Sequence, residues 1–127
     1  MAEFFPEMQG NGQGFFCIRP FMAGLLTDQR AERTQLPEGD RMLAENWEAA
    51  YERLEILKPA FGEDARRWTR FAIKFALIHP IVTSLIVGLN TPEQVDEVLD
   101  AVDGNYPDQE VFHKAQGIFR QHGMVAS

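Results

Sequence analysis

The 127-residue sequence has a single cysteine, Cys17, so no disulfide can form within the chain. Cys17 lies in the apolar run 15–18, where a small buried hydrophobic side chain is favoured over a reactive thiol. The three histidines lie far apart in the sequence, and no cysteine and histidine cluster has the spacing of a metal site. These absences exclude an internally disulfide-bonded scaffold and predict no metal centre.

Long hydrophobic runs and positive charge are also scarce. The most apolar stretch, residues 71–89, is interrupted by Lys74, His79 and Pro80, whereas a membrane span needs about 20 nearly uninterrupted apolar residues. The N-terminus lacks the cationic start and long apolar core of a signal peptide. The 12 basic side chains are outnumbered by 19 acidic ones, which argues against a dedicated nucleic-acid-binding protein. We therefore expect a soluble, cytoplasmic protein with neither nucleic acid nor membrane as a partner.

What is present is a globular composition, with 45% hydrophobic and 24% charged residues, at the length of one domain. Two apolar runs, 15–19 and 81–89, are bounded by turn residues and predict strands, of which the first should be buried on both faces. Residues 27–43 are polar and predict a long surface loop that is functional or mobile. A turn at 11–14 follows what reads as the end of a helix at 3–8.

Helical periodicity fills the rest of the chain. A first helix should run from Glu45 to Lys58 and end before Pro59. Its apolar face consists of Trp47, Ala50, Tyr51, Leu54 and Leu57. A second helix should open at Glu63 and Asp64 and end at His79, with a face of Trp68, Phe71, Ala72, Phe75, Ala76 and Ile78 and a second half packed on more than one side. Core packing by the two tryptophans is favoured over contact with a substrate.

Two more helices follow the second predicted strand. Thr91 as N-cap, Pro92 in the first position and Gln94 three residues after the cap form a capping box. The inward stripe of this helix is predicted to be Val95, Val98, Leu99 and Val102. The last helix, residues 107–120, should bury Val111, Ala115 and Ile118, with Phe112 and Phe119 beside them.

Strands that alternate with helices predict parallel βα units within an α/β fold, with no repeat and no domain boundary in residues 1–127. Two parallel strands make no stable sheet alone, because each leaves an unpaired edge. The chain therefore either associates with other copies through these edges or is part of something larger.

Two segments, in this order, resemble the aldo/keto reductase family. Residues 15–27 (FFCIRPFMAGLLT) resemble the family's seventh strand and the loop that follows it. Residues 75–97 (FALIHPIVTSLIVGLNTPEQVDE) resemble its stretch of helix, His-Pro, eighth strand, glycine and Thr-Pro-Glu-Gln helix. The resemblance covers residues 1–121 and implies the C-terminal part of a TIM (β/α)8 barrel, an incomplete and helix-rich portion with the seventh and eighth strands.

The resemblance also implies a binding site for NADP, with NAD as the other candidate. Phosphates commonly bind where the last two strands of such barrels end, and here Gly88 ends a strand just before the start of the Thr91 helix, whose free amides would face a phosphate. The cofactor-binding residues implied by the match are Arg19, Pro20, Phe21, Gly24, Leu25, Gly88, Leu89, Asn90, Gln94 and Glu97. The alternatives are plain turn glycines at 24 and 88 and a structural ion pair for Arg19.

The chain departs from the family's pattern at several positions. Gln94 stands where many members have an arginine that contacts the adenosine phosphate, so the choice between NADP and NAD stays open. Arg19, Val87, Leu89 and Val98 also differ from the commonest residues. No segment matches the strands that carry the family's catalytic Asp, Tyr, Lys and His, so no catalytic residue is assigned.

Three hypotheses remain. The first is the cofactor-binding C-terminal portion of a reductase that transfers hydride from NAD(P)H to a small carbonyl substrate, with this chain inactive alone. The second is a non-catalytic nucleotide-binding or subunit-interaction module derived from that fold. The third is a small α/β domain that self-associates through its strand edges.

Overall fold

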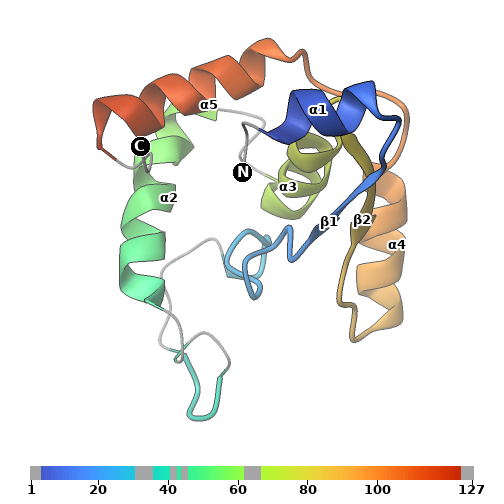
Figure 1. Ribbon diagram of the computed structural model, residues 1–127. Coiled ribbons are helices and arrows are strands. Elements are labelled where there is room, and N and C mark those ends of the chain that lie inside the picture. The colour runs from blue at the N-terminus through green and yellow to red at the C-terminus, as the bar shows by residue number, and fades with distance from the viewer. Residues whose placement is uncertain (1–3, 31–35, 41–42, 44–45, 62–66, 124–127) are drawn as a thin grey trace.

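The computed structural model of the chain describes residues 4–30, 36–40, 43, 46–61 and 67–123 (Figure 1). Its elements, in chain order, are α1 (Phe5–Gly10), β1 (Phe15–Ile18), α2 (Trp47–Phe61), α3 (Trp68–Leu77), β2 (Val82–Ile86), α4 (Pro92–Ala101) and α5 (Glu110–Gln121). This confirms the predicted alternation of strands and helices. None of the helices in these ranges is long and apolar enough to cross a membrane.

The two strands lie side by side and run parallel, as predicted (Figure 1). Phe15 pairs with Val82 and Ile18 with Ile86, and the register is irregular between Phe15 and Phe16. At this irregularity the Phe15 N–H donates to Thr83 Oγ1 at 3.1 Å. Because the strands are parallel, their carboxyl ends meet at one edge of the sheet.

One face of the sheet is open in the described part of the chain. The apolar side chains of Phe16, Ile18 and Ile86 lie on this face and are largely exposed, Phe16 at 65%. The prediction that β1 is buried on both faces is therefore wrong. α3 packs against β2 from the other side, and no described segment covers the face that carries Phe16.

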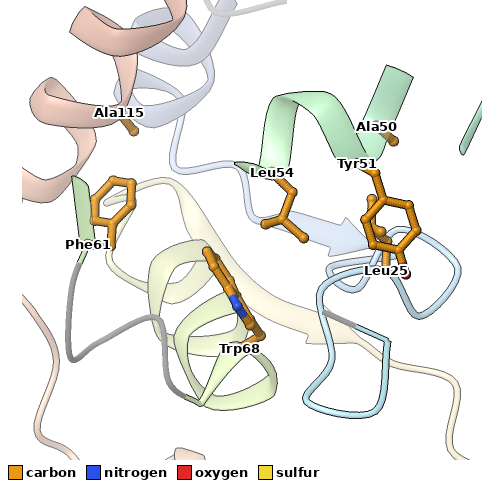
Figure 2. Close-up of a cluster of buried hydrophobic side chains, with 7 residues drawn as sticks. All are labelled: Leu25, Ala50, Tyr51, Leu54, Phe61, Trp68 and Ala115. Atoms are coloured by element: carbon orange, nitrogen blue, oxygen red, sulfur yellow. The ribbon is translucent and has the colours of Figure 1, made fainter. Parts of the chain in front are cut away.

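The main core lies away from the sheet, among α2, α3, α5 and the segment after β1 (Figure 2). Its buried members are Leu25, Ala50, Tyr51, Leu54, Phe61, Trp68 and Ala115. Trp47 and Leu57 pack against it partly buried, so the predicted apolar face of α2 is confirmed. The predicted apolar face of α5 is also confirmed, because its partly buried residues Val111, Ile118 and Phe119 pack against the core. Both tryptophans are packing residues, as expected.

The helix α2 does not end before Pro59 but continues to Phe61. A proline this close to the end of a helix removes only one hydrogen bond of the final turn. Phe61 is buried in the core, and this burial offsets the lost bond. The predicted start of the next helix, at Glu63 and Asp64, lies outside the described residues, and α3 begins at Trp68.

The second half of α3 is packed on several sides, as predicted. Ile73 is buried although it lies outside the predicted face, and Thr69 and Lys74 are buried as well. The Lys74 ammonium donates to Asp103 Oδ1 at 2.8 Å and to the carbonyl of Asn105, and it lies 5.8 Å from the ring centre of Tyr106. These contacts join α3 to the segment after α4.

The inward face of α4 differs from the predicted stripe. Val95, Leu99 and Val102 are exposed, Leu99 at 65%, whereas Ala101 is fully buried and Val98 is half-buried. α4 packs against α3. Ala101 is the buried residue of α4, so the inward face of this helix carries a small side chain in place of the predicted valine and leucine stripe.

Candidate functional site

A cavity of about 600 Å³ lies where the two parallel strands end. One wall comes from the segment after β1 and the polar loop beyond it, and the other from the segment after β2 and the first turns of α4. Nine of the ten predicted cofactor-binding residues line it: Arg19, Pro20, Phe21, Gly24, Gly88, Leu89, Asn90, Gln94 and Glu97. The tenth, Leu25, does not, because its side chain is buried in the core cluster.

Other lining residues were not predicted. They are Met22, Ala23, Thr27, Gln29, Arg30, Gly39, Asp40, Thr69 and Val98. Most belong to the stretch after β1 and the loop that the sequence marks only as long, polar and functional or mobile. The positions of these residues at the cavity depend on the tertiary fold of the chain, which no local sequence pattern specifies.

The turn after β1 holds its backbone in an uncommon conformation. Met22, Ala23 and Gly24 have φ values of 50°, 57° and 96°, and Arg19 has 57°. Such a φ costs about 1–3 kcal/mol for a residue other than glycine. Hydrogen bonds hold the turn, since the N–H groups of Gly24 and Leu26 both donate to the carbonyl of Phe21 at 3.0 Å. Leu25, buried just behind it, anchors the turn to the core.

Gly24 is required by conformation and by space. Its φ of 96° suits glycine, and a Cβ there would lie 3.2 Å from Cδ of Arg30. The Arg30 stem therefore passes close to the backbone of this turn. Gly88 is different, because its φ is not in the left-handed region and a Cβ would meet no atom within 4 Å. The chain does not need glycine at 88 in order to turn, which argues against the alternative of a plain turn glycine there, and a side chain at 88 would occupy open space.

Arg30 and Asp40 form a bidentate ion pair at the cavity. Arg30 Nη1 donates to Asp40 Oδ1 at 3.0 Å and Nη2 donates to Oδ2 at 2.6 Å. The Asp40 side chain is only 7% exposed, and this hydrogen bond raises the pKa of Arg30 above its usual value. Paired charges in this geometry fix the plane of the guanidinium group. Asp40 thus sets how Arg30 is presented to the cavity.

The backbone beneath Arg30 is held by two helices. The Tyr51 hydroxyl, on α2, donates to the carbonyl of Arg30. Thr69, buried on α3, accepts a hydrogen bond at its Oγ1 from the Asp28 N–H at 3.2 Å. Arg67 donates from Nε to Asp28 Oδ2 at 3.2 Å. The cavity wall that carries Arg30 is therefore tied to the core on both sides.

The first turn of α4 is capped by side chains of the residues around its own N-terminus. Thr91 Oγ1 accepts from the Gln94 N–H at 3.3 Å, as the predicted capping box requires. The Gln94 side chain returns one residue further than in the usual box, since its Oε1 accepts from the Asn90 N–H at 2.7 Å. Hydrogen bonds from its own N–H and from the Thr91 hydroxyl lower the pKa of Glu93. The amides of Asn90 and Gln94 are thus already bonded within the chain, contrary to the expectation that free amides here would face a phosphate.

The other chemistry-bearing residues lie elsewhere. His79 packs against the rings of Phe5 and Phe112, at 5.1 and 5.4 Å between ring centres, and Tyr51 is buried in the core. Neither of these, nor Tyr106, lines the cavity. Within the described ranges, no group of three or more His, Cys, Asp or Glu residues is placed to hold a metal ion.

The comparisons with known proteins agree with the resemblance seen in the sequence. The fold is similar to the apo and holo structures of the aldo-keto reductase AKR11C1 from Bacillus halodurans, both with 26% sequence identity and a TM-score of 0.66. The match covers 92% of this chain but only 38% of the apo chain and 37% of the holo chain. This chain therefore spans less than two-fifths of those relatives. No curated protein matches it. The sequence model of the aldo/keto reductase family matches residues 1–114, and the chain belongs to that family.

Proposed function

We propose that this chain binds a nicotinamide dinucleotide and corresponds to the C-terminal part of an aldo/keto reductase barrel. The observation that carries the proposal is the convergence of two segments, 19–24 and 88–97, on one cavity at the carboxyl ends of parallel strands. Ligands of α/β proteins bind at this edge, and in barrels phosphates commonly bind by the last two strands. In the whole reductase the cofactor would supply hydride for the reduction of a carbonyl substrate.

The cavity fits such a ligand in size and chemistry. Its volume of about 600 Å³ falls within the range of small-molecule and cofactor sites. Arg19 and Arg30 offer N–H donors to a pyrophosphate, while Phe21, Leu89 and Val98 offer apolar surface to the rings. The holo form of the Bacillus halodurans reductase, as a structural relative, supports a ligand-binding role. NADP and NAD both remain candidates on these grounds.

The open sheet supports the idea of a partial barrel. Each described strand has one neighbour, and the exposed face with Phe16, Ile18 and Ile86 is apolar enough to pack against further protein. We propose that β1 and β2 are the seventh and eighth strands of the barrel. No residue of the chain is assigned to proton transfer, so the chain alone should be inactive. Carbonyl-dependent oxidation of NADPH by the purified chain would refute this part.

The test is a pair of glycine substitutions read by calorimetric titration with NADH and NADPH. Gly88→Val adds a side chain at the cavity wall where no protein atom lies within 4 Å, so the fold should survive while the ligand loses space. Gly117→Val is the matched control, because a Cβ at Gly117 also meets nothing within 4 Å and the residue lies in α5, outside the cavity lining. We expect the wild type and the Gly117→Val control to bind the dinucleotide equally well and Gly88→Val to bind it more weakly. Equal binding by all three would place the ligand elsewhere.

A second candidate function rests on the exposed apolar face of the sheet. This face favours a subunit-interaction module, in which two copies associate through their open strands. Sedimentation at several concentrations tests it, with Phe16→Thr as the variant that should weaken association. A monomer at all concentrations would remove this candidate. A cytoplasmic location stays a prediction from the sequence.

A further inference from the structure

We propose that the outer face of α4 is a docking surface for a cationic amphipathic helix of a partner polypeptide. This outer face consists of Val95, Leu99 and Val102, three apolar residues that are exposed in the described fold. The inference concerns a contact between proteins, so it goes beyond the proposed binding of a dinucleotide. It does not depend on which ligand the cavity takes.

The outer face has the spacing of a helix that packs against another helix. Val95, Leu99 and Val102 stand at positions i, i+4 and i+7, so their side chains follow one another along one side of α4 and its C-cap. α3 packs against the inner side, where Ala101 is buried, and α4 lies at the margin of the fold (Figure 1). Single exposed apolar residues are ordinary, whereas a row at this spacing is how one helix anchors on another.

A row of carboxylates runs along the same helix. Its exposed members are Glu93, Asp96 and Asp100. α4 contains no lysine or arginine. Arg70 and Lys74, on the helix that packs against α4, are both bound to Asp103, and none of the three carboxylates forms an ion pair within the described ranges. Like charges three and four positions apart destabilise a helix, and cations from a partner would relieve this repulsion.

The charges decide which occupant fits the outer face. A second copy docked through the same face would bring the carboxylates of both copies to one contact, and like charges brought together oppose association. An uncharged or acidic helix would cover the apolar row but leave the repulsion within α4 in place. A helix with lysine or arginine beside its own apolar stripe complements both the apolar row and the carboxylates. The occupant is therefore a cationic amphipathic helix.

The experiment titrates the full chain with a dye-labelled amphipathic peptide of leucine and lysine, about 14 residues long, read by fluorescence anisotropy. A peptide of leucine and glutamate with the same pattern is the anionic counterpart. The lysine peptide should bind, more weakly as salt is added, and the glutamate peptide should not. Leu99→Ser should weaken binding about tenfold or more, because it removes an apolar anchor and keeps the charge.

A matched pair of charge reversals tests the carboxylates. Asp96→Lys should weaken binding of the lysine peptide about fivefold or more, because it places a cation against cations. Glu52→Lys makes the same change of net charge at an exposed position of α2 and should stay within about twofold. All of these substitutions lie on the surface, so the fold should survive them.

Several results would overturn the inference. One is no binding of the lysine peptide, and another is equal binding of the two peptides. Equal weakening by Asp96→Lys and Glu52→Lys would reduce the contact to attraction by net charge. Weakening by Phe16→Thr without weakening by Leu99→Ser would place the peptide on the open sheet, and self-association abolished by Leu99→Ser would assign the face to a second copy. Each of these results leaves dinucleotide binding by the cavity standing, so the two proposals fail separately.

Discussion

The hydroxyl of Tyr51 should contribute measurably to stability, because it ties the cavity loop to the core. Tyr51 is 1% exposed and packs edge-on against Trp47, with ring centres 5.6 Å apart. Its hydroxyl donates to the carbonyl of Arg30, whose side chain lines the cavity. Tyr51→Phe removes this donor and keeps the buried ring, so it isolates the hydrogen bond from the packing (Figure 2).

The expected loss follows from the burial of the site. Removing one partner of a hydrogen bond while the other keeps its place costs about 1–2 kcal/mol. A urea slope of about 1–3 kcal/mol/M converts this into a transition midpoint lower by about 0.3–2 M. This free energy is a large fraction of the stability of a small domain. The variant should therefore unfold clearly earlier than the wild type while its urea slope stays the same.

Urea unfolding followed by far-ultraviolet circular dichroism measures this loss. Tyr106→Phe is the matched control, since it deletes the same atom from a partly exposed ring for which no hydroxyl hydrogen bond is described. The control should stay within about 0.5 kcal/mol of the wild type. If the two variants lose the same stability, the Tyr51 hydroxyl does not hold the loop and the reasoning is wrong.

Two further variants test the core and the contact between α3 and the segment after α4. Leu54→Ala should lose about 2–5 kcal/mol in urea unfolding because it leaves a cavity in the core, whereas the exposed Leu99→Ala should change little. The hydrogen bond from Lys74 is the largest cause that lowers the pKa of Asp103 from 3.8 to about 2, so this carboxylate stabilises the fold above pH 3.8 and loses that effect as pH falls toward 2. The difference in stability between the wild type and Asp103→Asn should therefore shrink over that interval in acid unfolding, and a constant difference would contradict the pairing.

Much of the fold follows from local patterns. The apolar face of α2 and the two strand segments are each specified by a local hydrophobic pattern. The start of α4 is specified by its capping residue, Thr91. The residues that the sequence assigned to the site also converge, because parallel strands deliver the segments that follow them to one edge. Leu25 lies in the core and not at the cavity wall. An apolar residue in a tight turn points toward either the core or the ligand, and the sequence does not specify which.

The remaining differences come from tertiary packing. The α4 stripe was predicted from side-chain hydrophobicity, but in the fold the buried residue of α4 is Ala101, on the neighbouring face. The pair of Arg30 and Asp40 bridges a long loop, so neither residue carries a signal by itself. Pro59 looks like a helix end in isolation, and only the burial of Phe61 explains why α2 continues past it.

A map of backbone amide chemical shifts on addition of NADH is the most direct measurement of ligand binding at the strand ends. The largest changes should fall on the amides of Phe21, Gly24, Gly88 and Asn90, which come from both walls of the cavity. Amides of α5, such as that of Gly117, should change little. An unchanged spectrum at millimolar NADH, or changes that fall on α5 alone, would contradict the assignment of this cavity to a nicotinamide dinucleotide.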